Sequence, residues 1–179
     1  MNEQRKTINW KMALITGVVV ALLSELHVNM FVTDFRVSAS VIVFPVLLLT
    51  ICRGSSALVS AVVTAVLVFA IRLVLGAAGG GTSLETIFPG AFFYFTYGAI
   101  FMLIEGGEEN ANLPRIFFSA FSADLVSNIF EVMLREQILG ISDMNQATII
   151  QLMGIAVVRA LIAVLVLGII RRREGNVSV

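Results

Sequence analysis

Two stretches of the chain decide its fold: IFFSAFSADLVSNIFEVML (residues 116–134) and IIQLMGIAVVRALIAVLVLGII (residues 149–170). Each approaches or exceeds the ~20 apolar residues that cross a ~30 Å hydrocarbon core as a helix. Each also carries an ionisable residue near its middle, Asp124 in the first and Arg159 in the second. A charge at that depth costs about 2.5–3.5 kcal/mol on insertion scales. The sequence therefore predicts that these opposite charges pair between adjacent helices.

The composition of the whole chain agrees with a membrane location. Of 179 residues, 58% are apolar and 13% are charged, and the mean hydropathy is +0.96. A soluble domain of this size cannot bury so much apolar surface. Because the formal net charge is zero, no nucleic-acid partner is expected. The single cysteine, Cys52, and the single histidine, His27, exclude an internal disulfide and a multi-histidine metal site, and we expect no metal and no cofactor.

Six apolar segments run along the chain. Inside a bilayer such long runs satisfy their backbone groups only as helices, so we expect a single all-α membrane domain over residues 1–179. The second segment is short and contains Pro45, which predicts a tilted or only partly spanning helix. The predicted helices are 12–31, 38–52, 56–75, 87–104, 114–134 and 148–170.

The basic residues predict the orientation. With six spans, both termini lie on the same side of the membrane. That side would hold most of the basic residues, whereas the other would hold only Arg36, Arg72 and Arg135. The positive-inside rule then places both termini in the cytoplasm of a bacterial cell, in a multi-pass inner-membrane protein. The basic residues on the cytoplasmic side would be Arg5, Lys6, Lys11, Arg53, Arg115, Arg171, Arg172 and Arg173.

The fifth segment carries a polar stripe. Its members stand at i, i+4, i+7 and i+11, which places them on one helical face: Asp124, Asn128, Glu131 and Arg135. Such a face must meet the bundle interior or a water-filled cavity. One interpretation is a ligand pocket open to the outside; the other is interhelical hydrogen bonding that only holds the bundle together. Likewise, Arg159 is either a permanent structural partner of Asp124 or a group for which a ligand carboxylate competes.

Other polar residues stand near the predicted outer ends of helices. They either converge on one outer vestibule, with Arg36 and Arg72 attracting the ligand, or extend separately into water. These residues are Glu25, His27, Asp34, Arg36 and Arg72.

Two further patterns concern packing. The run FPGAFFYFTYG (88–98) is either an aromatic belt at the membrane interface or the wall of a pocket. Ala13, Gly17 and Ala21 form a ridge of small residues on the first segment. Such a ridge lets helices approach closely, within one chain or between two chains.

No catalytic motif is present. The sequence has no nucleophile elbow, no HExxH and no P-loop, and its glycine-rich stretch 75–86 lacks the residues that would cradle a phosphate. We therefore expect no enzymatic activity from this chain.

Four stretches resemble the multi-span membrane input domains of bacterial sensor histidine kinases. They are TDFRVSASVIVFPVLLL (33–49), FPGAFFYFTYG (88–98), SADLVSNIFEVMLRE (122–136) and VVRALIAVLVLGIIRRRE (157–174). The resemblance implies a six-helix sensor whose last helix passes a signal to a cytoplasmic kinase. Only six residues follow Arg173, so the kinase parts themselves are not in this chain. The sequence is then either a fragment or a relative that needs a kinase partner.

The chain also resembles the substrate-binding subunits of energy-coupling-factor vitamin transporters. Those subunits are six-helix proteins of similar size with a ridge of small residues on the first helix, which Ala13, Gly17 and Ala21 match. The resemblance implies uptake of a small molecule with separate coupling and ATPase partners.

The leading hypothesis is a membrane-embedded sensory domain that binds a small polar or anionic molecule from outside. The predicted ligand-binding residues are Asp124, Asn128, Glu131, Arg159, Arg135, Arg36 and Arg72. Binding would shift a two-state equilibrium of the last helix. The expected partners are the lipid bilayer, the ligand, and a second copy of the chain or a cytoplasmic kinase or coupling protein. The alternative is the uptake subunit.

Overall fold

The computed structural model describes residues 9–25, 27–29, 36–50, 55–79, 84–105, 112–140 and 146–177. These residues form six α-helices and one two-stranded antiparallel ribbon. The helices are α1 (Trp10–Leu23), α2 (Ala39–Thr50), α3 (Ser55–Gly79), α4 (Leu84–Glu105), α5 (Leu113–Leu139) and α6 (Gln146–Val177). The strands are β1 (His27–Asn29) and β2 (Arg36–Ser38).

Four of these helices, α3 to α6, are long and apolar enough to cross a membrane. Their outward faces carry large apolar side chains that no other part of the described chain covers, such as Val74 at 65%, Leu103 at 81% and Leu165 at 65% exposure. A soluble monomer rarely exposes so many large apolar side chains to water, whereas a membrane protein exposes them to lipid. The protein is therefore membrane-embedded, and its outer surface is suited to contact with lipid.

The first two helices are shorter than a membrane is thick. With 14 and 12 residues, α1 and α2 are only about 21 and 18 Å long. The short second helix confirms the prediction, and Pro45 lies inside it. The first helix was predicted to reach residue 31, which is wrong, because it ends at Leu23. There the Ser24 hydroxyl donates to the Ala21 carbonyl at 2.7 Å, and β1 follows shortly afterwards.

The β1–β2 ribbon was not predicted, so the description as all-α is correct for the spanning elements only. His27 pairs with Ser38, Val28 with Val37 and Asn29 with Arg36. Such short strands leave little sequence signal, because three residues are too few to show an alternating pattern.

The last two helices run beyond their predicted ends. Instead of ending at 134, α5 continues to Leu139, where Gly140 terminates it with a positive φ of 68°. The Gly140 N–H donates to the Glu136 carbonyl at 2.9 Å, the usual arrangement of a glycine C-cap. Similarly, α6 continues past residue 170 to Val177.

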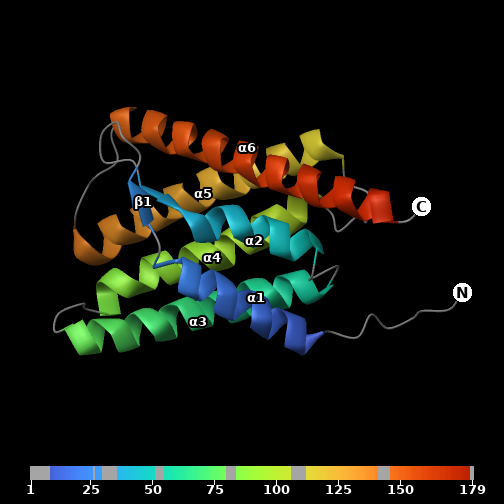
Figure 1. Cartoon of the computed structure of the whole chain (residues 1–179). Coiled ribbons are helices and arrows are strands. Elements are labelled where there is room, and N and C mark those ends of the chain that lie inside the picture. Colours follow the sequence, from blue (N-terminus) through green and yellow to red (C-terminus); the bar gives the residue numbers. More distant parts are fainter. Residues whose placement is uncertain are drawn as a thin grey trace, which may run out of the picture.

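The helices alternate in direction along the chain (Figure 1). The first residues of α1 and the last residues of α6 lie at one end of the bundle, and the β1–β2 ribbon lies at the other. Helix α4 packs between α3 and α5, α1 packs on α3, and α6 covers α5 and α2. The residues between α2, α4, α5 and α6 are consequently enclosed by helices from both halves of the chain.

An aromatic core holds α2 to α4. The Phe44 ring on α2 lies 6.0 Å from the ring of Tyr94 and 5.7 Å from that of Tyr97, both on α4. Next to them, Gly98 lets α3 come close, because a Cβ at this position would meet the Cβ of Ala61. The aromatic run of α4 is therefore mainly a packing surface.

The ridge of small residues on α1 also packs inside the chain. Ala13 and Ala21 are fully buried, and a Cβ on Gly17 would lie only 3.0 Å from Cγ1 of Val63 on α3. Of the two predicted roles, contact within the chain is the one that the structure shows.

Candidate functional site

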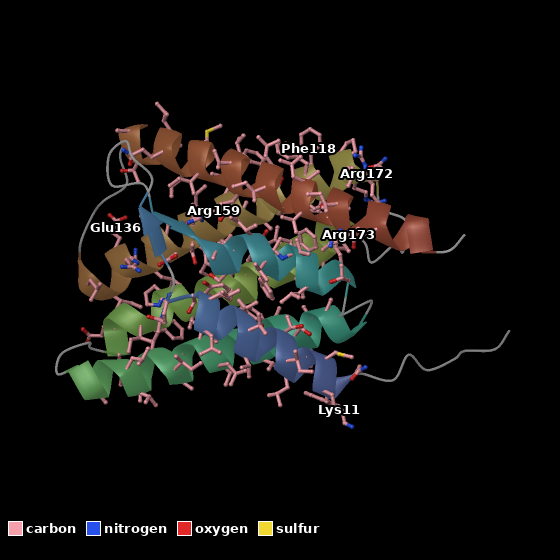
Figure 2. All side chains as sticks on the ribbon, viewed as in Figure 1. Lys11, Phe118, Glu136, Arg159, Arg172 and Arg173 are labelled. Carbon is pink, nitrogen blue, oxygen red and sulfur yellow. The ribbon has the colours of Figure 1, made fainter. Side chains whose placement is uncertain are left out.

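Asp124 and Arg159 meet across the α5–α6 interface, as the sequence predicts. Nη1 of Arg159 lies 3.1 Å from Oδ1 and 3.4 Å from Oδ2 of Asp124. Asp124 is only 1% exposed and Arg159 only 9%, and Figure 2 shows Arg159 at mid-length of α6. The two charges are thus removed from the lipid-facing surface and compensate each other.

A second donor completes the surroundings of the Asp124 carboxylate. Nδ2 of Asn128, one turn further along α5, lies 2.7 Å from Oδ1 and 2.7 Å from the backbone carbonyl of Asp124. Oδ1 therefore accepts from both Asn128 and Arg159. Ser127 is fully buried beside them, and its hydroxyl has no hydrogen-bond partner within the described residues.

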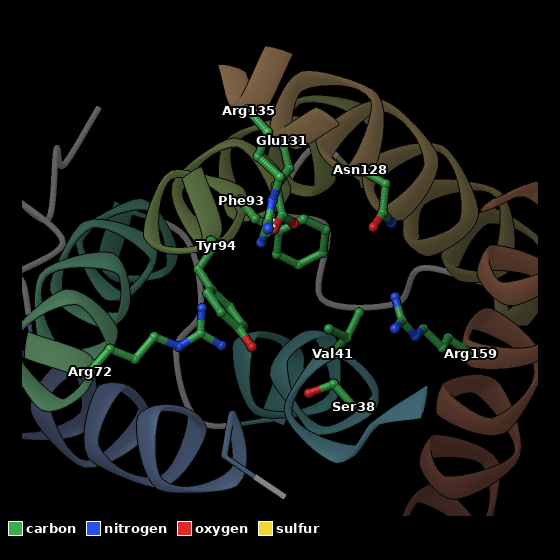
Figure 3. A pocket seen from close by; sticks show the side chains of 10 residues that line it. Ser38, Val41, Arg72, Phe93, Tyr94, Asn128, Glu131, Arg135 and Arg159 are labelled. Carbon is green, nitrogen blue, oxygen red and sulfur yellow. Dashed lines mark hydrogen bonds and ion pairs between the residues drawn. The ribbon is translucent and has the colours of Figure 1, made fainter. Parts of the chain in front are cut away.

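A cavity of about 250 Å³ opens beside this pair, on the side of the β1–β2 ribbon (Figure 3). Elements from the whole chain contribute to it: β2, α2, α3, α4, α5 and α6. Its lining residues are Ser38, Val41, Arg72, Gly90, Phe93, Tyr94, Asn128, Glu131, Arg135 and Arg159. Five of the predicted site residues are among them, namely Arg72, Asn128, Glu131, Arg135 and Arg159.

Arg72 reaches the cavity from α3. Its Nε donates to Oε1 of Glu25, just beyond the end of α1, at 3.1 Å. Its terminal Nη1 occupies the position that a Cβ on Gly90 would need, and Oε1 of Glu131 lies 3.8 Å from that position. Gly90 on α4 therefore provides the space in which the Arg72 guanidinium lies near Glu131.

Glu131 and Arg135 form an ion pair one turn apart on α5. Nη2 and Nε of Arg135 donate to Oε1 of Glu131 at 2.6 and 3.2 Å. The Glu131 side chain is 20% exposed and that of Arg135 is 42% exposed. This pair thus lies toward the mouth of the cavity, whereas Arg159 lies at its buried end.

A chain of three hydroxyl groups joins the ribbon and α2 to α4. The Ser38 and Ser40 hydroxyl oxygens are 2.5 Å apart, and the Ser40 hydroxyl lies 2.6 Å from that of Tyr94. All three side chains are buried. Since Ser38 and Tyr94 line the cavity, the hydroxyl chain fixes one wall of it.

Some lining residues were missed by the sequence interpretation. Ser38 and Val41 gave no signal, because they lie in the short apolar run 38–52, which was interpreted only as a tilted or partly spanning helix. Gly90, Phe93 and Tyr94 fall in the aromatic run 88–98, for which a pocket wall was one of two readings. Of these three, Tyr94 carried the clearest signal, because the hydroxyl of a tyrosine within an apolar helix needs a hydrogen-bond partner.

Some residues that the sequence assigned to the site do not line the cavity, and the side chains of others lie outside the described residues. Asp124 does not line it; it lies behind Arg159 and Asn128 and holds both in place. Arg36 and His27 belong to the ribbon, but their side chains lie outside the described residues, and so does Asp34. Glu25 does not line the cavity but accepts a hydrogen bond from Arg72, which does.

The groups that line the cavity are suited to recognising a small polar molecule. In the part of the chain that the structure describes, no three histidine, cysteine or carboxylate side chains cluster as metal ligands would. The polar groups around the cavity are guanidinium, carboxylate, amide and hydroxyl groups that can hydrogen-bond a small polar molecule.

Comparisons of the chain with family models, with curated proteins and with solved structures each return no match. The function is therefore inferred from the site itself.

Proposed function

We propose that the chain is a sensory membrane domain that binds a small polar molecule from outside the cell and reports it through α6. One observation supports this most directly. Arg159 of α6 lines the cavity and is also the residue whose Nη1 holds the Asp124 carboxylate of α5. A ligand that draws the guanidinium toward itself changes the contact between these helices.

The distribution of charge supports a cavity that faces outward. Figure 2 shows Lys11, Arg172 and Arg173 at one end of the bundle and Glu136 at the other. The cavity lies toward the Glu136 end, because Arg135 and Ser38 line it. By the positive-inside rule the basic end is cytoplasmic, so the cavity opens to the outside of a bacterial inner membrane.

The size of the cavity limits the ligand. Drug-sized ligands occupy pockets of about 300–1,000 Å³. The volume here is about 250 Å³. A small metabolite fits such a space.

The form of α6 supports transmission to the cytoplasm. This helix has 32 residues, so it is about 48 Å long and exceeds the ~30 Å hydrocarbon core. It runs unbroken from the level of the cavity to the basic end. Because a helix is stiff, a tilt or rotation at Arg159 reaches Arg173 and a kinase partner beyond it.

The alternative, an uptake subunit, receives less support. The ridge of Ala13, Gly17 and Ala21 was the feature that favoured it, and this ridge is covered by α3. A buried ridge is not available for docking to a separate coupling protein.

Spin-label distances test the proposal in the full chain in nanodiscs. Leu165→Cys on α6 and Val66→Cys on α3, both exposed to lipid, carry the labels in a Cys52→Ala background. We expect a mixture of small amino acids, carboxylic acids and sugars to change the distance distribution between the labels. The change should be lost with Arg159→Gln and kept with Arg173→Gln, which removes the same charge at the exposed end of α6. A distribution that no component of the mixture alters would contradict the sensory function.

A further inference from the structure

We infer that the ligand is a net-neutral small molecule carrying both signs of charge, with its anionic group at Arg72 and its cationic group at Glu131. This inference rests on the proposed function and specifies the class of molecule that the cavity takes. Three independent features of the site lead to it.

The first feature is the balance of charge. Among the described side chains, each arginine of the cavity is paired with a carboxylate: Arg72 with Glu25, Arg135 with Glu131, and Arg159 with Asp124. A ligand with a net charge would leave one charge uncompensated in a membrane-embedded site, which is strongly unfavourable. A zwitterion adds one charge of each sign and keeps the balance.

The second feature is the arrangement of the groups that still have hydrogen-bonding capacity. Arg72 uses only Nε in its bond to Glu25, so its two terminal amino groups donate to no described residue. Glu131 accepts both bonds from Arg135 through Oε1, so its Oε2 accepts from none of the residues that the structure describes. The site thus offers a donor pair on one side and a carboxylate oxygen on the other.

These two groups lie close together above Gly90. Both Nη1 of Arg72 and Oε1 of Glu131 are within 4 Å of the position of a Cβ on Gly90. A positive and a negative group so near each other match a ligand whose own ammonium and carboxylate are separated by few bonds. A ligand with two distant charges would not reach both without leaving the cavity.

The third feature is aromatic. Phe93 and Tyr94 are 4% and 3% exposed and line the same cavity as Glu131. The face of an aromatic ring attracts a cation within about 6 Å of its centre. The rings and the Glu131 carboxylate together favour an ammonium group. The Ser38 hydroxyl, which lies across the cavity from Glu131 in Figure 3, is neutral.

Three matched probe pools test the inference by thermal unfolding of the full chain in nanodiscs. The first pool contains the amino acids with uncharged side chains, the second their N-acetyl derivatives, and the third their amides. These pools carry both charges, only the negative charge and only the positive charge, respectively. We expect the first pool alone to raise the unfolding midpoint of the wild-type protein, by about 5 °C at saturation.

Charge variants make the test specific. Glu131→Gln should weaken stabilisation by the zwitterionic pool about tenfold and shift the preference toward the N-acetyl pool. Arg72→Gln should shift it toward the amides. Glu136→Gln, the same change on α5 outside the cavity, should behave as the wild-type protein does.

Two results would overturn the inference. If the N-acetyl pool stabilises the wild-type protein as well as the amino acids do, the ligand is an anion and the proposed function stands. If no pool stabilises any variant, the ligand is of another class, and the α6 distance measurement alone decides whether the domain is a sensor.

Discussion

At the scale of single residues, Asp124 and Arg159 show how a membrane protein retains charge. Nη1 of Arg159 lies 3.1 Å from Oδ1 of Asp124, and Asn128 supplies a further donor at 2.7 Å. The carboxylate is therefore paired with a cation and also accepts a hydrogen bond from a neutral amide. Removing one partner leaves the other charge buried without compensation, whereas removing both leaves none.

Asp124→Ala should consequently destabilise the protein more than the double change Asp124→Ala with Arg159→Ala. Breaking a buried pair typically costs about 3–5 kcal/mol, while replacing both partners costs far less. Folded yield and resistance to denaturant in detergent micelles measure the effect. Losses that simply add in the double variant would show that the two side chains are not energetically coupled.

Gly90 makes room for one of the arginines that line the cavity. Its missing side chain provides the space in which the Arg72 guanidinium approaches Glu131. The guanidinium is the far end of a flexible side chain and can move aside. A larger residue at 90 would therefore disturb the cavity more than the fold.

At the scale of elements, α3 and α4 are held together by a close approach. A Cβ on Gly98 would meet the Cβ of Ala61 and would lie 3.3 Å from its Cα. Because a Cα cannot move without its helix, any side chain at 98 must push the two helices apart. Gly168 on α6 is different, since its Cβ would meet only Cδ1 of Leu113, at 3.9 Å.

Gly98→Ala should therefore destabilise the bundle by about 1–3 kcal/mol, the usual cost of an overpacked core. Gly168→Ala serves as the matched control and should be neutral or stabilising by up to about 1 kcal/mol, because alanine is the better helix former. Denaturant titrations in micelles compare the two variants. Equal stability of both variants would contradict the tight contact between α3 and α4.

Because α1 and α2 are short, the ribbon between them lies at the cavity. Neither α1 nor α2 is as long as the four spanning helices, and the β1–β2 ribbon lies between them in the chain. As a result Ser38, at the end of β2, lies at the cavity and starts the hydroxyl chain to Tyr94. Two full-length helices at these positions would occupy the space that the ribbon leaves at the cavity.

At the scale of the whole molecule, the two ends of the bundle differ in chemistry. Exposed basic side chains gather where α1 begins and α6 ends, and the ion-paired cavity lies toward the opposite end. The α6 helix connects the two ends without a break. This arrangement suits a domain that receives a molecule at one surface and reports it at the other.

Cysteine labelling in intact cells checks the orientation. In a Cys52→Ala background, Gln137→Cys at the end of α5 should react with a membrane-impermeant thiol reagent. Arg173→Cys at the end of α6 should react only after the cells are broken. Both positions are exposed, so access alone does not distinguish them. The reverse pattern of labelling would place the cavity on the cytoplasmic side.

The sequence alone predicts the membrane class, most of the helices and the pairing of Asp124 with Arg159. Each follows from the high free-energy cost of placing unpaired backbone groups or charges in hydrocarbon. This cost is the same however the helices are arranged. It also predicts five of the ten cavity residues, since a polar stripe must avoid lipid.

Only the tertiary structure decides the rest. The end of α1 at Leu23, the ribbon, the position of Arg72 above Gly90 and the link from Ser38 through Ser40 to Tyr94 each depend on residues distant in the chain. Glycine and serine in a helix fit many environments at nearly equal local energy. Their roles are therefore fixed by the residues that pack against them. The pattern of residue types along the sequence does not identify those distant residues.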